Sequence, residues 1–175
     1  QSFNEAGYPK IELRIDRLDR LLAMVKKYDR QICDTIAEDY GVRAYELSRL
    51  AEVFVTIEQT KHAISSVAQW MQPESRVARS AESQVSAEVH FQPKGVVGII
   101  APWNFPVHLI LSPLVCVLAA GNRAMLKPSE ITPRTAELIS EMIGDFFDPS
   151  EVSVVLGDAK ASAQFSELPF DHLVF

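Results

Sequence analysis

The segment that most constrains the fold is residues 95–106, which read GVVGIIAPWNFP. It opens with a short apolar run bounded by glycine and proline, a pattern typical of a strand that is covered on both faces. Pro102 and Pro106 then restrict the backbone at, and just before, their own positions. The sequence therefore predicts a buried strand that runs into a stiffened loop carrying Asn104, at the edge where open α/β sheets bind ligands.

After this loop the pattern alternates between strands and helices. Apolar runs predict strands over residues 96–101, 123–127, 152–156 and 172–175. We expect one helix to begin near Val107 or at Pro113, where Ser112 could cap it. Another is expected to begin with Thr132 as its N-cap and Pro133 in its first turn. Such alternation favours an α/β fold with a parallel, doubly wound sheet.

The first 84 residues predict a helical arm. Apolar residues recur at helical spacing in three stretches, over residues 11–25, 32–37 and 43–71. The third stretch is the longest, and an unbroken helix there would measure on the order of 40 Å. The apolar stripe that we expect along it comprises Leu47, Leu50, Phe54, Ile57, Ile64, Ala68 and Met71.

The arm is followed by a connector and a strand. Residues 73–84 are polar and are predicted to form the connector. The apolar period then changes from near 3.6 to 2, because Val85, Ala87, Val89 and Phe91 alternate with polar residues. This alternation predicts a half-buried strand with one wet face over residues 85–92.

Composition excludes several classes of function. The net charge is −6 and no run of Lys or Arg occurs, which argues against a nucleic-acid partner. The most apolar segment, residues 107–121, is too short and too interrupted to span a membrane. The 4 histidines show no metal-ligand spacing, so no metal site is expected. The 2 cysteines form no disulfide framework, which favours a reducing, cytoplasmic location.

Polar residues follow three of the predicted strands. Asn104, Lys127 with Glu130, and Gly157 each come just after a strand, so a parallel sheet would bring them to one edge. An amide can stabilise a developing oxyanion, and a Lys/Glu pair can hold the hydroxyls of a ribose. A glycine lets a flat ring approach the backbone.

Ordinary structural interpretations of the same residues stay open. An Asn after a proline is usually a turn residue, a Lys at a strand end is usually a solvated charge, and Gly157 followed by Asp158 is most often a turn. Trp103 is more often a core residue than a platform for a ligand. Neither common glycine-rich phosphate-binding motif occurs in the sequence.

Three segments together resemble the aldehyde dehydrogenase superfamily. They read GVVGIIAPWNFP, LAAGNRAMLKPSEITPRTAELI and FDHLVF, and the resemblance is strong over residues 85–175 and weaker over the helical arm before them. The SEITPRT sequence and the helical arm are most similar to the coniferyl aldehyde dehydrogenase branch. The resemblance implies an NAD- or NADP-dependent oxidation of an aldehyde to its carboxylic acid, with an aromatic aldehyde of the coniferyl type as one candidate substrate. It also implies a Rossmann-like sheet and a homo-oligomer, either a dimer or a tetramer.

The resemblance also assigns roles to individual residues. Asn104 matches the amide that stabilises the oxyanion formed when a thiolate attacks the aldehyde. Lys127 and Glu130 match the pair that holds the adenosine ribose, and Gly157 matches the glycine near the adenine. The residues that match the wall of the site next to the nicotinamide are Ile100, Ala101, Pro102 and Trp103.

The resemblance finally implies a division of the chain and a set of missing parts. Residues 1–84 match a helical arm, residues 85–92 a strand of the oligomerisation region, and residues 93–175 an incomplete dinucleotide-binding domain. The nucleophilic cysteine and the general-base glutamate are expected further downstream, so residues 1–175 alone are expected to be inactive. A reductase of acyl-thioesters or acyl-phosphates with the same sheet, and a non-catalytic association module, remain alternatives.

Overall fold

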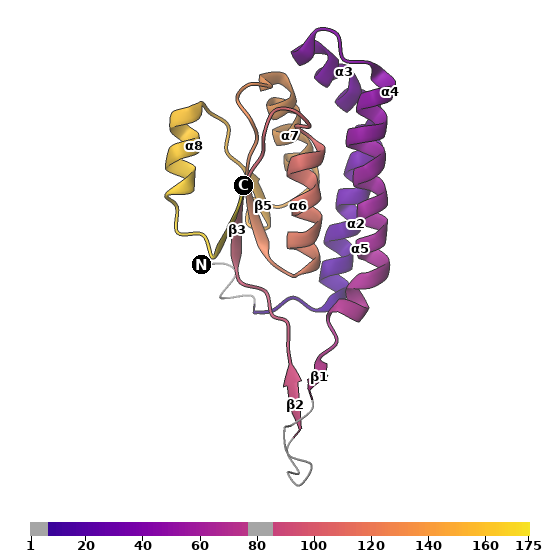
Figure 1. Ribbon diagram of the computed structural model, residues 1–175, viewed down its shortest axis with the longest axis vertical. Coiled ribbons are helices and arrows are strands. Elements are labelled where there is room, and N and C mark those ends of the chain that lie inside the picture. Colours follow the sequence, from indigo (N-terminus) through magenta and orange to yellow (C-terminus); the bar gives the residue numbers. More distant parts are fainter. Residues whose placement is uncertain (1–6, 77–85) are drawn as a thin grey trace.

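A computed structural model of the chain describes residues 7–76 and 86–175. Its elements stack in layers around a parallel sheet, with helices on both faces (Figure 1). The strands are β3 (Val96–Ile100), β4 (Arg123–Lys127), β5 (Val152–Val154) and β6 (His172–Val174). Their order is β5-β4-β3-β6, and every neighbouring pair is parallel. This arrangement confirms the predicted partial, doubly wound α/β sheet.

Helices cover the two faces of the sheet unequally. Helices α6 (His108–Ala119) and α7 (Pro133–Phe146) pack on one face, where α6 contacts β3 and β4 and α7 contacts β5. Helix α8 (Ala159–Ser166) lies on the opposite face, beside β3 (Figure 1). Strand β3 is apolar along its whole length because α6 packs on one of its faces and α8 on the other.

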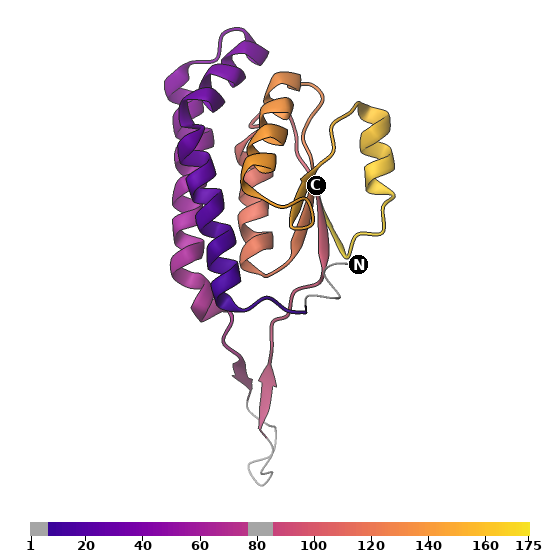
Figure 2. The ribbon, with the colours of Figure 1, turned by 180° about the vertical axis from the view of Figure 1, so that it is seen from behind.

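The arm forms a further layer outside α6 and α7 (Figure 2). It consists of α2 (Ile11–Lys27), α3 (Asp29–Tyr40), α4 (Tyr45–Ser48), the π-helix η1 (Arg49–Phe54) and α5 (Val55–Trp70). Gly41 ends α3 in a left-handed conformation, with φ of 78°. Helices α2 and α5 pack against α6, and α3 packs against α7, so one hydrophobic core runs through the arm and the sheet layer.

The prediction for the buried face of the third arm helix was only partly right, because Ile57, Ile64 and Met71 of the predicted stripe do pack against the core. Leu47, Leu50 and Phe54 are between 51% and 60% exposed, although they belong to the predicted apolar stripe. The buried face instead carries four polar residues spaced four apart, Ser48, Glu52, Thr56 and Thr60. The reason is the π-helical stretch, whose turns hold more residues than α-helical turns and so rotate the residues before it relative to those after it.

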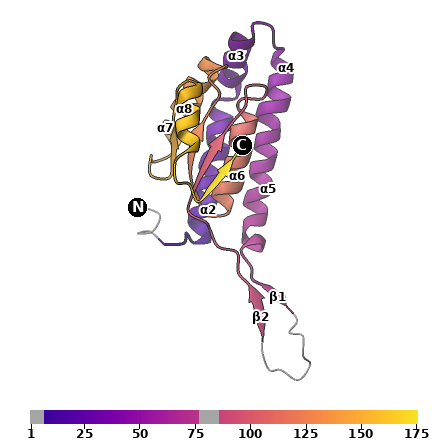
Figure 3. The same ribbon diagram turned by 60° about the vertical axis from the view of Figure 1, so that its left-hand side comes forward.

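The predicted half-buried strand was also only partly right. Strand β2 (Ala87–Val89) exists, but it pairs with β1 (Glu74–Arg76) in a two-stranded antiparallel ribbon whose residues are all exposed. The ribbon projects away from the other layers (Figure 3), so nothing covers the described part of either face. Strand β1 lies within the segment predicted as a connector, and Val85 lies outside the described residues.

The predicted helix starts met mixed outcomes. Helix α6 begins near Val107, and Pro113 lies inside it, so the alternative start capped by Ser112 was wrong. Helix α7 begins at Pro133 as predicted, but the side chain of Thr132 makes no capping hydrogen bond.

Within the described residues, no helix is long and apolar enough to cross a membrane, and no cluster of His, Cys, Asp and Glu could hold a metal ion.

Candidate functional site

The carboxyl ends of β3, β4 and β5 meet at one edge of the sheet, because these strands are parallel neighbours. Ile100, the last residue of β3, lies opposite Lys127, the last residue of β4. The Ala101 N–H donates a hydrogen bond of 3.1 Å to the Lys127 carbonyl, which extends the pairing by one residue. The loops that carry Asn104, Glu130 and Gly157 therefore leave the same edge, as predicted.

The loop with Asn104 is bound to the arm through its backbone. The carbonyl of Asn104 accepts a hydrogen bond of 2.9 Å from Nη1 of Arg43, and the carbonyl of Trp103 accepts one from the Tyr40 hydroxyl. The guanidinium of Arg43 also lies 4.8 Å from the centre of the Phe105 ring, within cation–π range. The side chain of Trp103 is 48% exposed, so its interpretation as a core residue was wrong.

Glu52, from the π-helix η1, holds the far end of this loop. Its side chain is completely buried, and Oε2 accepts hydrogen bonds from the N–H groups of Val107, at 3.0 Å, and His108, at 2.8 Å. These are the first N–H groups of α6, which lacks a side-chain cap from its own N-cap residue. Oε1 of Glu52 forms an ion pair of 3.1 Å with Nη2 of Arg43.

Two opposing effects act on the Glu52 carboxyl. Burial raises the pKa of Glu52, since water no longer stabilises the charged form. The N–H of His108, the guanidinium of Arg43 and the N–H of Val107 lower the pKa, but they do not fully offset the burial. The charged form of Glu52 is thus stabilised by these partners and not by water.

Lys127 is buried beneath the edge of the sheet, with only 1% of its surface exposed. Its Nζ donates a hydrogen bond of 2.8 Å to the Pro128 carbonyl and lies 3.7 Å from Oε2 of Glu130. The alternative that Lys127 is a solvated charge was therefore wrong. A buried ammonium at the end of a central strand is a fixed positive charge beside the Glu130 carboxylate.

Glu130 and Gly157 line one small pocket of about 200 Å³ above this edge. The other residues around it are Pro128, Ser129, Pro133, Ala136, Glu137 and Leu156. Gly157 has φ of 144°, and a Cβ there would lie 2.6 Å from the Cβ of Ala161. The structure thus brings Glu130 and Gly157 together, whereas Asn104 does not line this pocket.

The arm also caps α7, beside the same pocket. The Asp39 carboxylate accepts hydrogen bonds from the N–H groups of Arg134, at 3.2 Å, and Thr135, at 2.8 Å. It accepts a third from the Thr135 hydroxyl at 2.7 Å. Asp39 therefore replaces the predicted cap Thr132, whose hydroxyl is buried without a hydrogen-bond partner.

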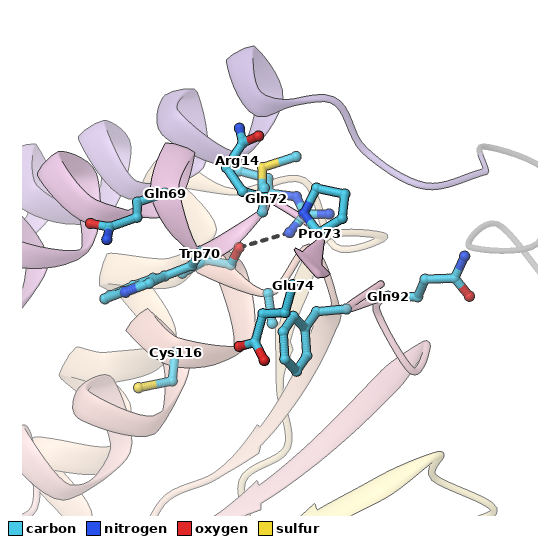
Figure 4. Close-up of a pocket in the computed structure, with 12 residues that line it drawn as sticks. Arg14, Gln69, Trp70, Gln72, Pro73, Glu74, Gln92 and Cys116 are labelled. Atoms are coloured by element: carbon cyan, nitrogen blue, oxygen red, sulfur yellow. Dashed lines mark hydrogen bonds between the residues drawn. The ribbon is translucent and has the colours of Figure 1, made fainter. Parts of the chain in front are cut away.

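A larger pocket, of about 680 Å³, lies at the opposite edge of the sheet (Figure 4). It is formed where α5 and α6 end and where the β1–β2 ribbon leaves, with Trp70, Pro73 and Cys116 in its wall. A hydrogen bond of 3.1 Å from Arg14 to the Ala119 carbonyl closes one side. None of the predicted site residues lines this larger pocket.

Sequence reasoning missed the residues of the arm that hold the site, namely Asp39, Tyr40, Arg43 and Glu52. Their partners lie between 55 and 96 residues further along the chain, which no local pattern reveals. One signal could have pointed to Glu52: it belongs to a row of polar residues spaced four apart, within a helix that is otherwise rich in apolar residues.

Comparison with known proteins agrees with this architecture. Residues 2–170 match the model of the aldehyde dehydrogenase family. A coniferyl aldehyde dehydrogenase from a Pseudomonas species is 47% identical over 98% of this chain, which corresponds to 35% of the relative. A probable coniferyl aldehyde dehydrogenase from Caulobacter vibrioides is 42% identical over 97% of the chain and 36% of its own length.

Solved structures give the same result. The structure described as the substrate-bound state of Staphylococcus aureus AldH superposes with a TM-score of 0.94 at 29% identity, over 99% of this chain and 38% of that one. The chain thus spans about a third of the length of the relatives it matches. Because the family model covers nearly all of its residues, the chain belongs to the aldehyde dehydrogenase family.

Proposed function

We propose that the protein oxidises an aldehyde to its carboxylic acid with NAD or NADP, and that Asn104 stabilises the oxyanion of this reaction. The observation that carries the proposal is the placement of Asn104. It lies at the carboxyl edge of a parallel sheet, on a loop whose backbone is bonded to the arm in its middle and at its end. A donor fixed in advance needs no reorganisation as negative charge develops, which makes it an effective stabiliser.

The residues around the small pocket suit the adenosine part of a dinucleotide. Glu130 lines the pocket and can accept hydrogen bonds from ribose hydroxyls. Lys127 does not line the pocket, but its Nζ lies 3.7 Å from Glu130, and it is proposed to donate to the same hydroxyls. Gly157 presents backbone without a side chain, so a flat base can approach it. Ile100, Ala101, Pro102 and Trp103 are proposed to form the wall beside the nicotinamide. The dinucleotide would supply the acceptor for the hydride that leaves the substrate.

The proposed part of this chain in the chemistry is to bind the dinucleotide and to donate a hydrogen bond to the oxyanion. The side-chain N–H of Asn104 would donate to the carbonyl oxygen as a thiolate attacks the aldehyde carbon, and that oxygen becomes negatively charged. Neither cysteine of this chain suits the role of the nucleophile. Burial raises the pKa of Cys33 to about 11, and Cys116 lies in α6 at the pocket on the opposite edge.

Further proposals concern the whole protein. Two of them are named coniferyl aldehyde dehydrogenases, which supports an aromatic, coniferyl-type aldehyde as the substrate. We also propose a cytoplasmic homo-oligomer, in which residues 1–84 form the arm, residues 85–92 serve oligomerisation, and residues 93–175 form part of the dinucleotide-binding domain. The nucleophilic cysteine and the general-base glutamate would lie outside residues 1–175.

The test is Asn104→Ala in the full-length gene product, assayed with a coniferyl-type aldehyde. We expect kcat to fall on the order of 100-fold, because an oxyanion donor is lost, while the Kd of the dinucleotide stays within about twofold. Glu130→Gln serves as the matched comparison and should show the reverse pattern, with weaker dinucleotide binding and a nearly unchanged kcat. An Asn104→Ala variant that keeps its kcat in single-turnover measurements would remove Asn104 from the mechanism.

A further inference from the structure

We propose that Arg43 and Glu52, both in the helical arm, are positioning residues that fix the loop carrying Asn104 for catalysis. The inference rests on the proposed function, because that function gives Asn104 its role. It goes further by assigning a catalytic contribution to a part of the chain that lies outside the sheet. Neither residue is proposed to touch the substrate or the dinucleotide.

Arg43 holds the middle of the loop. One guanidinium nitrogen donates to the carbonyl of Asn104, and a second pairs with Glu52. The guanidinium carbon lies 5.1 Å from the centre of the Tyr40 ring and 4.8 Å from that of the Phe105 ring. Its side chain is only 7% exposed, so water competes weakly for these contacts. The bond from Arg43 goes to the backbone of Asn104, so it can orient the residue without using the side-chain amide.

Glu52 holds the end of the loop. Its Oε2 accepts hydrogen bonds from the N–H groups of Val107 and His108, the two residues that come directly after Pro106. The carboxylate therefore fixes the point at which the loop becomes α6, while Arg43 fixes the point three residues before Val107. Since Arg43 and Glu52 are also bound to each other, the two attachment points cannot move independently.

Simple capping of α6 does not account for this arrangement. A cap needs only the bonds from Glu52 to the first N–H groups of the helix. The bond from Arg43 to Asn104 adds nothing to the cap, and burial of two charges is costly compared with apolar packing of the same volume. The directional bonds of a buried guanidinium instead determine where a backbone carbonyl lies, which is what a positioned donor requires.

The first experiment measures kinetics of Arg43→Met in the full-length gene product. We expect kcat to fall between about tenfold and 100-fold, because a small displacement of a catalytic group is costly, with the Kd of the dinucleotide unchanged. Arg43→Lys should recover part of the loss, since it keeps a donor and a charge. The control is Arg49→Met, which removes an exposed ion pair with Asp29 in the same arm and should leave kcat unchanged.

A double-mutant cycle then separates positioning from general damage. If Arg43 acts through Asn104, the double variant R43M/N104A should have the same kcat as Asn104→Ala alone. Losses that multiply would overturn the inference while leaving the proposed function intact. Because Arg43→Met leaves the Glu52 carboxylate buried without its partner, R43M/E52Q is measured as well. It removes both charges together, and its kcat should stay as low as that of Arg43→Met.

Hydrogen exchange tests the inference without any reaction. The amides of residues 103–105, 107 and 108 should exchange at least about tenfold faster in R43M/E52Q than in the wild-type protein, because local opening costs less free energy when the loop loses Arg43 and the charged acceptor at position 52. Arg49→Met should leave them unchanged. Equal exchange in R43M/E52Q and wild type would overturn the positioning role, even if Asn104→Ala proved the proposed function right.

Discussion

The arm meets the sheet layer at two helix N-termini, and the two junctions differ in their surroundings. At α6, Glu52 is completely buried and paired with Arg43; at α7, Asp39 is only partly buried. Both carboxylates accept two backbone N–H groups from a helix that has no side-chain cap of its own. The same chemistry should therefore contribute differently to stability, since water can reach Asp39 and its partner Arg134 but neither Glu52 nor its partner Val107.

The largest expected effect comes from the buried junction. Glu52→Ala leaves the Arg43 guanidinium and two N–H groups without their partner, so we expect a loss of about 3–5 kcal/mol in the free energy of unfolding. Urea-induced unfolding of the full-length gene product, followed by circular dichroism, measures this loss. R43M/E52Q is the control, and it should be less destabilised because no buried charge stays unpaired. A loss below about 1 kcal/mol for Glu52→Ala would contradict the proposed dependence of this junction on its ion pair.

Removal of the capping carboxylate at α7 should reduce the free energy of unfolding by a smaller amount. Asp39→Ala removes three hydrogen bonds. Water can solvate the freed N–H of the exposed Arg134, but not the two freed groups of the buried Thr135, so the expected loss is about 1–2 kcal/mol, at the upper end for helix caps. The same unfolding measurement applies, with Asp39→Asn as the conservative comparison, because its amide oxygen can still accept. If Asp39→Ala cost as much as Glu52→Ala, burial would not be what separates the two junctions.

The two junctions also show what a sequence can reveal. The sheet was predicted well, because apolar runs, glycines and prolines are local signals, and the strand over 123–127 matched to the residue. The shared edge of Asn104, Lys127, Glu130 and Gly157 followed from one topological rule. The arm was predicted as helical for the same reason, because its three apolar stretches are local as well.

The orientation of the arm could not be predicted in this way. The period of 3.6 fails across the π-helix, so the apolar residues Leu47, Leu50 and Phe54 turned out to be exposed. The capping carboxylates act on helices more than 50 residues away, and Thr132 looked like a better cap for α7 than Asp39 did. Such partners are selected by tertiary packing, which adjacent residues do not encode.

A third junction between the arm and the sheet layer reverses the roles and sharpens the comparison. Here the sheet layer supplies the carboxylate, Glu151 next to β5, and α2 supplies two guanidinium groups. Nε of Arg17 lies 2.9 Å from Oε1 of Glu151, and Nη1 of Arg20 lies 2.8 Å from Oε2. Burial by itself raises the pKa of Glu151, but the hydrogen bonds from Arg20 and Arg17 outweigh it and hold the pKa below its ordinary value.

This lowered pKa predicts the smallest of the three effects and gives it a sign. In the unfolded chain Glu151 takes up a proton near pH 4.3, the ordinary value for a glutamate, whereas in the folded protein it does so at a lower pH. The contribution of Glu151 to stability is therefore complete above the unfolded pKa of about 4.3, and it is lost as the pH falls from there through the folded pKa. For partly exposed ion pairs the contribution is about 1 kcal/mol or less. Glu151→Gln should accordingly show a shallower loss of stability between pH 5 and about pH 3, in urea unfolding at constant ionic strength. Identical pH profiles for the variant and the wild type would mean that this junction, unlike the buried one at Glu52, contributes nothing through its charges.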